Sequence, residues 1–117
     1  MPDAIGESAP LRFDIRQEQR ATVVSVSGEI DIDTTPDLTD VLTDSLPETD
    51  MLVLDLTDVG FIDSIGLRAL VDIHLKAAAA DRAVRLVVGD GATRRPIEIS
   101  GLNQVLSVYR DLDEALT

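Results

Sequence analysis

MLVLDLTDVGFIDSIGLRALVDIHLKAAAA, residues 51–80, is a strand pattern followed directly by a helix pattern. Residues 51–57 are mostly apolar at both alternating positions, which predicts a central strand buried on both faces. Gly60 predicts that residues 58–63 form a loop. Ser64 then stands where a helix should begin, and its hydroxyl could accept a hydrogen bond from the first turn as the N-cap. The stretch therefore predicts a strand–loop–helix unit with a serine at the helix start.

The apolar residues after Ile65 recur with the period of a helix. The predicted buried stripe comprises Leu67, Leu70, Val71, His74, Leu75 and Ala78. The predicted outer face comprises Ile65, Arg68, Ala69, Asp72 and Lys76, with Ile73 at its margin. A helix with one buried face does not need apolar residues on its outer face. We therefore expect Ile65 to be exposed beside Ser64, next to the positive end of the helix dipole.

Strand and helix patterns alternate along the rest of the chain. Two strands precede the first helix, which starts near Pro36 and ends before Pro47. The later patterns predict a strand over residues 83–88, a helix over 93–100, an edge strand over 105–109 and a helix over 111–116. This order predicts one α/β domain over residues 11–117, with a mixed, mostly parallel sheet, an antiparallel N-terminal hairpin and about four flanking helices. Residues 1–10 are expected to form a flexible tail.

The composition excludes several classes of protein. The 117 residues include no Cys and one His, which excludes disulfides, thiolate metal sites and sites of several histidines. A net charge of −12 disfavours nucleic acid and acidic membranes. It fits a partner with a basic patch and equally a role in solubility, and composition alone does not separate the two. No stretch reaches the roughly 18 apolar residues of a membrane span, and no signal peptide opens the chain. We expect a cytoplasmic protein without cofactor or metal ion.

Enzymatic roles for the polar residues are disfavoured. A serine hydrolase needs a base near Ser64, but the only histidine, His74, lies roughly 15 Å further along the predicted helix. A phosphoacceptor domain built on Asp55 would need a lysine after its last strand, and the only lysine is Lys76, within a helix. The acidic loop residues Asp31, Asp58 and Asp63 have irregular spacing and are expected to be solvated rather than to bind a cation. The sequence therefore predicts no enzyme.

Three short motifs, in order, resemble those of STAS-domain anti-sigma factor antagonists: GEIDIDTTPDL (residues 28–38), FIDSIGL (61–67) and ISGL (99–102). Asp63, Ser64, Gly66 and Leu67 match the family pattern D-S-[S/T]-G-L. Ile65 departs from it, because the family usually has a small hydroxyl residue there. The resemblance covers about residues 11 to 116 and implies a STAS-like fold.

The resemblance also implies a function. Such antagonists bind an anti-sigma factor, usually a serine kinase, and so release the sigma factor. Phosphorylation of the serine that Ser64 matches abolishes binding, and a Ser/Thr phosphatase restores it. Asp31 matches a family aspartate that lies close to this serine. A phosphate at a helix N-terminus is locally favourable, so the modification should not unfold the domain.

We expect the partner to contact a surface around the helix start, and the free chain to be monomeric. The predicted partner-binding residues are Asp31, Asp33, Asp63, Ile65, Gly66, Arg68, Ala69 and Asp72. An alternative stays open, because some free-standing STAS domains are subunits of transport or signalling complexes and are never phosphorylated.

Overall fold

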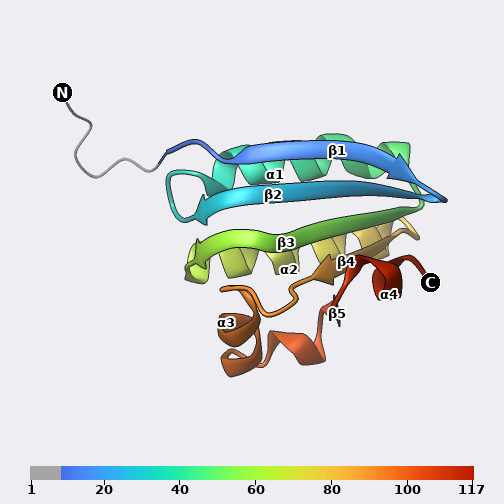
Figure 1. The fold of residues 1–117 in the computed structure, drawn as a ribbon. Coiled ribbons are helices and arrows are strands. Elements are labelled where there is room, and N and C mark those ends of the chain that lie inside the picture. The colour runs from blue at the N-terminus through green and yellow to red at the C-terminus, as the bar shows by residue number, and fades with distance from the viewer. Residues whose placement is uncertain (1–8) are drawn as a thin grey trace.

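The computed structural model describes residues 9–117 and shows a five-stranded sheet with its helices and connections (Figure 1). Most of the predicted tail, residues 1–8, lies outside the described residues. The elements are β1 (Arg12–Glu18), β2 (Ala21–Ile30), α1 (Thr35–Ser45), η1 (Leu46–Glu48), β3 (Met51–Ile62), α2 (Ser64–Ala79), β4 (Ala83–Val87), α3 (Arg94–Ile99), η2 (Leu102–Gln104), β5 (Ser107–Tyr109) and α4 (Leu112–Leu116).

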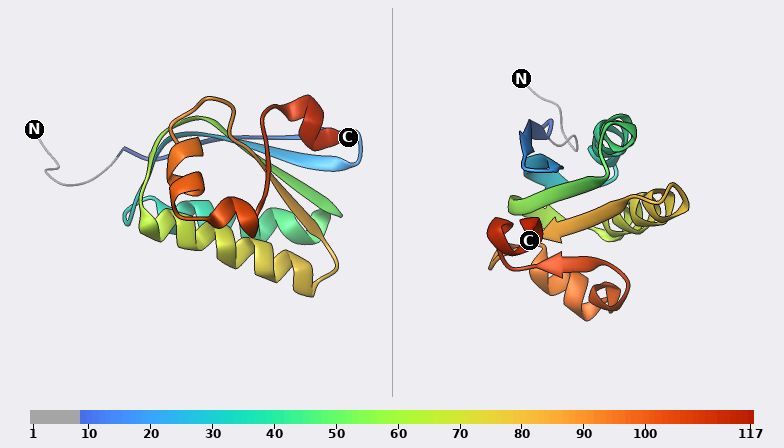
Figure 2. Two further views of the ribbon diagram at one scale, coloured as in Figure 1. Left: turned by 90° about the horizontal axis from the view of Figure 1, so that it is seen from below. Right: turned by 90° about the vertical axis from the view of Figure 1, so that its right-hand side faces the viewer.

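The strands lie in the order of the chain, β1-β2-β3-β4-β5. The β1–β2 pair is antiparallel and the other three pairs are parallel, which confirms the predicted mixed sheet and its N-terminal hairpin. Successive crossovers in one direction place α1 and α2 on the same face of the sheet. Figure 2 shows these two helices together on one face and α4 on the other.

The two faces of the sheet have separate apolar cores. The main core lies under α1 and α2 and includes Leu38, Leu42, Leu52, Leu54, Leu56, Leu70 and Ile73. The smaller core lies under α4 and consists of Ala21, Val23, Val53, Val87 and Ala115. Leu52, Val53 and Leu54 are fully buried, so β3 is covered on both faces, as its apolar pattern predicts.

The predicted loop over residues 58–63 is wrong, because β3 continues to Ile62. Its extension stays paired with β2, with Gly28 opposite Val59 and Ile30 opposite Ile62, through two register irregularities. Val59 and Ile62 are buried, so pairing and burial outweigh the breaker Gly60. As a result β2 and β3 end at the same level, and the residues that follow them are neighbours.

The predicted buried face of α2 is partly wrong. Its buried residues are Gly66, Leu70, Ile73 and Ala77. Ile73, expected at the margin of the outer face, is only 4% exposed, whereas Leu75 is 57% exposed. The remaining predicted stripe residues divide into half-buried Leu67, Val71 and His74 and exposed Ala78. The side of α2 that faces the sheet is therefore not the predicted stripe. It includes Gly66 instead.

Candidate functional site

Asp63 caps α2, and the prediction that Ser64 is the N-cap is wrong. The backbone of Asp63 is extended, and its Oδ1 accepts hydrogen bonds from the amides of Ile65 and Gly66, both at 3.0 Å. These are amides that the helix itself leaves without partners. Ser64 is the first helical residue, and its exposed hydroxyl makes no hydrogen bond with the described residues. The hydroxyl is therefore presented to solvent at a fixed helix end.

Asp31 occupies the corresponding position after β2. Its Oδ1 accepts hydrogen bonds from the amides of Asp33 (2.9 Å) and Thr34 (3.1 Å), which stabilises the turn before α1. The backbone amide of Asp63 donates to the carbonyl of Ile30 at 3.1 Å, which ties the two strand ends together. Asp31 and Asp63 therefore belong to adjacent turns beside Ser64, and both carboxylates stabilise local structure there.

Three exposed apolar side chains belong to the segments that surround Ser64. Ile32 is 63% exposed, Phe61 is 47% exposed and Ile65 is 41% exposed. Ile32 follows the end of β2, which pairs with the end of β3 that carries Phe61, and large exposed apolar residues are typical of protein-binding surfaces. We call Ile32, Phe61, Ser64 and Ile65 the Ser64 patch. Phe61 and Ile65 are both accessible, which leaves them available to a partner.

A shallow groove continues from the Ser64 patch along α2. It is lined by Ser64, Ile65, Leu67, Arg68, Val71, Ser100 and Leu102. Its far wall is the segment after α3, where the ISGL motif lies. The sequence did not indicate Ile32, Ser100 or Leu102 as site residues. The signal in the sequence for Ser100 and Leu102 is the ISGL motif, which contains both.

The other predicted site residues lie on different sides of α2. Arg68 and Asp72 are exposed and form an ion pair one turn apart, with Nε and Oδ1 at 3.4 Å. Such a pair contributes little to stability. Ala69 is half-buried and, with Asp72, lines a small groove toward α1. Asp33 is exposed beside Asp31. The prediction that Gly66 contacts a partner is wrong, because Gly66 is buried and offers no surface to a partner.

Gly66→Ala is expected to destabilise the fold. A Cβ at this position would lie 2.5 Å from Cγ2 of Ile30 and 2.8 Å from Cγ1 of Ile62. The overpacking should exceed the better helix preference of Ala, for a net loss of about 1–2 kcal/mol in the free energy of unfolding. Gly60→Ala is the control, because a Cβ there meets nothing within 4 Å. Urea denaturation measures both; an equally stable Gly66→Ala variant would contradict the close helix–sheet contact.

Asp63→Ala should lower the free energy of unfolding by about 0.5–2 kcal/mol, because the amides of Ile65 and Gly66 lose their acceptor. Asp63→Asn keeps a good capping oxygen and removes the charge, so it should stay close to the parent chain. Urea midpoints of the two variants separate capping from charge. Equal destabilisation by both would mean that the charge of Asp63, rather than its geometry, stabilises α2.

The described residues offer no alternative chemistry at this site. Between residues 9 and 117, no three acidic or histidine side chains group closely enough to hold a metal ion. His74 lies within α2 and is half-buried, ten residues after Ser64. None of the helices in this part of the chain combines the length and apolarity that a membrane crossing requires. Ser64 itself is exposed at the start of α2.

The STAS domain family matches residues 12–115, and the chain belongs to this family. It is 30% identical over 113 residues to the anti-sigma-F factor antagonist RsfB of Mycobacterium tuberculosis, which covers 94% of this chain and 92% of that protein. A crystal structure of an anti-sigma factor antagonist from Mycobacterium paratuberculosis superposes with a TM-score of 0.84 at 34% identity, over 91% of each chain.

The unphosphorylated form of the anti-sigma factor antagonist SpoIIAA shares the fold, with a TM-score of 0.72 at 17% identity over 90% of this chain and 93% of that one. These similarities place the chain among the anti-sigma factor antagonists of the STAS family. These are regulatory proteins rather than enzymes.

Proposed function

We propose that this chain binds an anti-sigma factor that is a serine kinase, and thereby releases the sigma factor. The kinase phosphorylates Ser64, and the phosphorylated chain no longer binds until a Ser/Thr phosphatase removes the phosphate. One observation carries this proposal: the exposed hydroxyl of Ser64 makes no hydrogen bond with the described residues, and Ser64 lies at the start of α2 between the exposed residues Phe61 and Ile65 of the sequence. A kinase that binds the patch would have the acceptor hydroxyl within its interface.

Charge and desolvation explain how one phosphate would switch such an interface. It adds about −1.5 to −2 charges at neutral pH. The amides of Ile65 and Gly66 already donate to Asp63, so the phosphate would lie beside a carboxylate that caps the same helix. Burying that charge against an apolar contact is costly, whereas on the free chain water solvates it. The modification therefore acts on binding and leaves the fold in place.

Phosphate transfer tests the proposal directly. The purified chain is incubated with candidate anti-sigma kinases and ATP, and the product is mapped by mass spectrometry. We expect one phosphate on Ser64, absent from Ser64→Ala and retained in Ser100→Ala, whose serine lines the same groove. Phosphate on Ser27, Thr57 or Ser100 instead would overturn the assignment. Binding to transport or signalling proteins with no transfer from any kinase would favour the alternative of an unphosphorylated STAS subunit.

Ile65→Asp is expected to weaken binding to the anti-sigma factor by more than about 1 kcal/mol, roughly fivefold, because it places an unpaired charge in a desolvated contact. Ile65 is 41% exposed, so the free energy of unfolding should change by no more than about 0.5 kcal/mol. Leu75→Asp is the matched control, since Leu75 is an exposed apolar residue of α2 outside the patch. Calorimetric titration gives the affinities; equal losses for both variants would exclude a specific role for Ile65.

A further inference from the structure

β1 is an edge strand whose outer side pairs with no other described strand. It carries Ile15, which is 52% exposed on the face of the sheet that α1 covers. Ile15 lines an open groove together with Val41 and Ser45 of α1. An open edge with an exposed apolar side chain is a surface on which another strand can pair.

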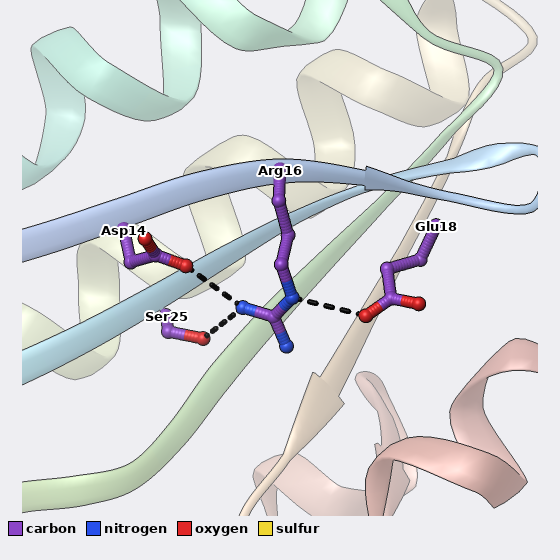
Figure 3. A network of polar contacts seen from close by, with 4 residues as sticks. All are labelled: Asp14, Arg16, Glu18 and Ser25. Carbon is purple, nitrogen blue, oxygen red and sulfur yellow. Dashed lines mark hydrogen bonds and ion pairs between the residues drawn. The ribbon is translucent and has the colours of Figure 1, made fainter.

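Charges of alternating sign line the opposite face of the same strand: Arg12, Asp14, Arg16 and Glu18. Figure 3 shows the guanidinium of Arg16 between its neighbours, with Nη1 at 2.9 Å from Asp14 and Nε at 3.0 Å from Glu18. Arg16 also donates to the hydroxyl of Ser25 at 3.1 Å. Arg12 makes no ion pair with the residues that the structure describes. These charged side chains can therefore form further ion pairs with a strand that joins the open edge of β1.

We propose that a second copy of this chain pairs edge to edge with β1, antiparallel, about a two-fold axis through Ile15. In this register Arg12 faces Glu18 of the second copy, and Asp14 faces Arg16 of the second copy. Four ion pairs form across the junction. The two Ile15 side chains meet at the axis. The result is a ten-stranded sheet with α1 and α2 of both copies on one face.

The charge pattern selects this register over its neighbours. A symmetric antiparallel pair of strands is centred on one residue. An axis through Asp14 would place Asp14 against itself and Arg12 against Arg16 of the second copy. An axis through Arg16 would place Arg16 against itself and Asp14 against Glu18 of the second copy. Like charges directly opposite each other destabilise a sheet, which disfavours both of these axes. Axes through Phe13 or Gln17 also avoid like charges, but within β1 each forms two opposite pairs, whereas the axis through Ile15 forms four.

The dimer leaves the proposed partner site accessible on both copies. Ser64 begins α2, which packs against β3 and β4 and lies away from the β1 edge (Figure 1). A partner would therefore meet two Ser64 patches on one particle. The junction is one ladder of seven residues, so we expect a weak, concentration-dependent association rather than an obligate dimer.

Sedimentation equilibrium of the full chain tests the dimer. Between about 1 µM and about 1 mM, the average mass should rise from 12.6 kDa toward twice that value. Arg16→Asp places Asp14 and the new carboxylate opposite each other at two symmetric positions, and should weaken association at least tenfold. The double exchange Asp14→Arg with Arg16→Asp restores opposite charges across the axis and should restore association.

The double exchange also separates the two roles of the charges. It places like charges next to each other along β1 while keeping opposite charges across the proposed junction, so recovery can only come from pairing between copies. Urea denaturation of both variants at low concentration verifies that the monomer is folded. A chain that remains at 12.6 kDa throughout, or a dimer that the Arg16→Asp variant forms equally well, would overturn the proposal.

Discussion

Ile73→Ala should lower the free energy of unfolding by about 2–5 kcal/mol, as is usual when a large aliphatic side chain is removed from a packed core. Ile73 is 4% exposed and belongs to the main core between the sheet, α1 and α2. Removing its side chain leaves a cavity that rigid neighbours, among them fully buried Leu42 and Leu70, cannot fill. Urea denaturation of the Ile73→Ala variant and of the parent chain measures the loss. Both curves are fitted with one common dependence of the unfolding free energy on urea concentration.

Leu75→Ala is the control on the same helix. Leu75 is 57% exposed, so its truncation should change the free energy of unfolding by no more than about 0.5 kcal/mol. The two variants distinguish the observed face of α2 from the face that periodicity predicts. A larger loss for Leu75→Ala than for Ile73→Ala would mean that the helix packs through the stripe expected from the sequence.

The sequence could not identify the buried face of α2, because the helix carries apolar residues on more than one side. Both the line through Leu67 and Leu75 and the line through Leu70 and Ile73 have helical spacing. Contact with the sheet selects the second line, since Gly66 allows close approach to Ile30 and Ile62. A tertiary contact of this kind has no signature in the hydrophobic period of the helix alone.

The β-strands were more predictable, because burial on both faces leaves a direct trace in composition. The β3 segment from Leu52 to Leu54 is apolar at every position, and all three residues are fully buried. The end of the strand was not predictable, since Gly60 is a loop signal that pairing with β2 overrides. The loop signal therefore predicts a loop position for Phe61, whereas the structure places it at the end of β3.

The sequence predicts a helix start at Ser64 but not which residue caps it. Aspartate and serine are similarly good N-caps, so the adjacent pair Asp63–Ser64 leaves the choice open. The extended backbone of Asp63 makes that residue the cap. The error has a functional consequence: the hydroxyl of a capping serine would be engaged with the helix, whereas the hydroxyl of Ser64 is available for modification.

Phosphorylation of Ser64 should weaken binding to the anti-sigma factor by ten- to a thousand-fold, about 1.4 to 4 kcal/mol. This prediction rests on the proposed function. The phosphate would carry its charge into the contact made by Phe61 and Ile65, where neither side chain offers a hydrogen-bond donor. The measurement is the affinity of the stoichiometrically phosphorylated chain, compared with the same sample after phosphatase treatment, which should recover full affinity.

The same phosphate should change the free energy of unfolding by less than about 1 kcal/mol, because Ser64 is exposed and bears no structural hydrogen bond. Attraction to the helix N-terminus and repulsion from Asp63 act in opposite directions, and the amides of Ile65 and Gly66 already donate to Asp63. Circular dichroism and urea denaturation of the phosphorylated chain measure this change. If the phosphate instead removed much of the helical signal, the loss of binding would come from unwinding of α2. The switch would then be a conformational one, in place of the local charge effect at the interface that the geometry of Asp63 and Ser64 supports.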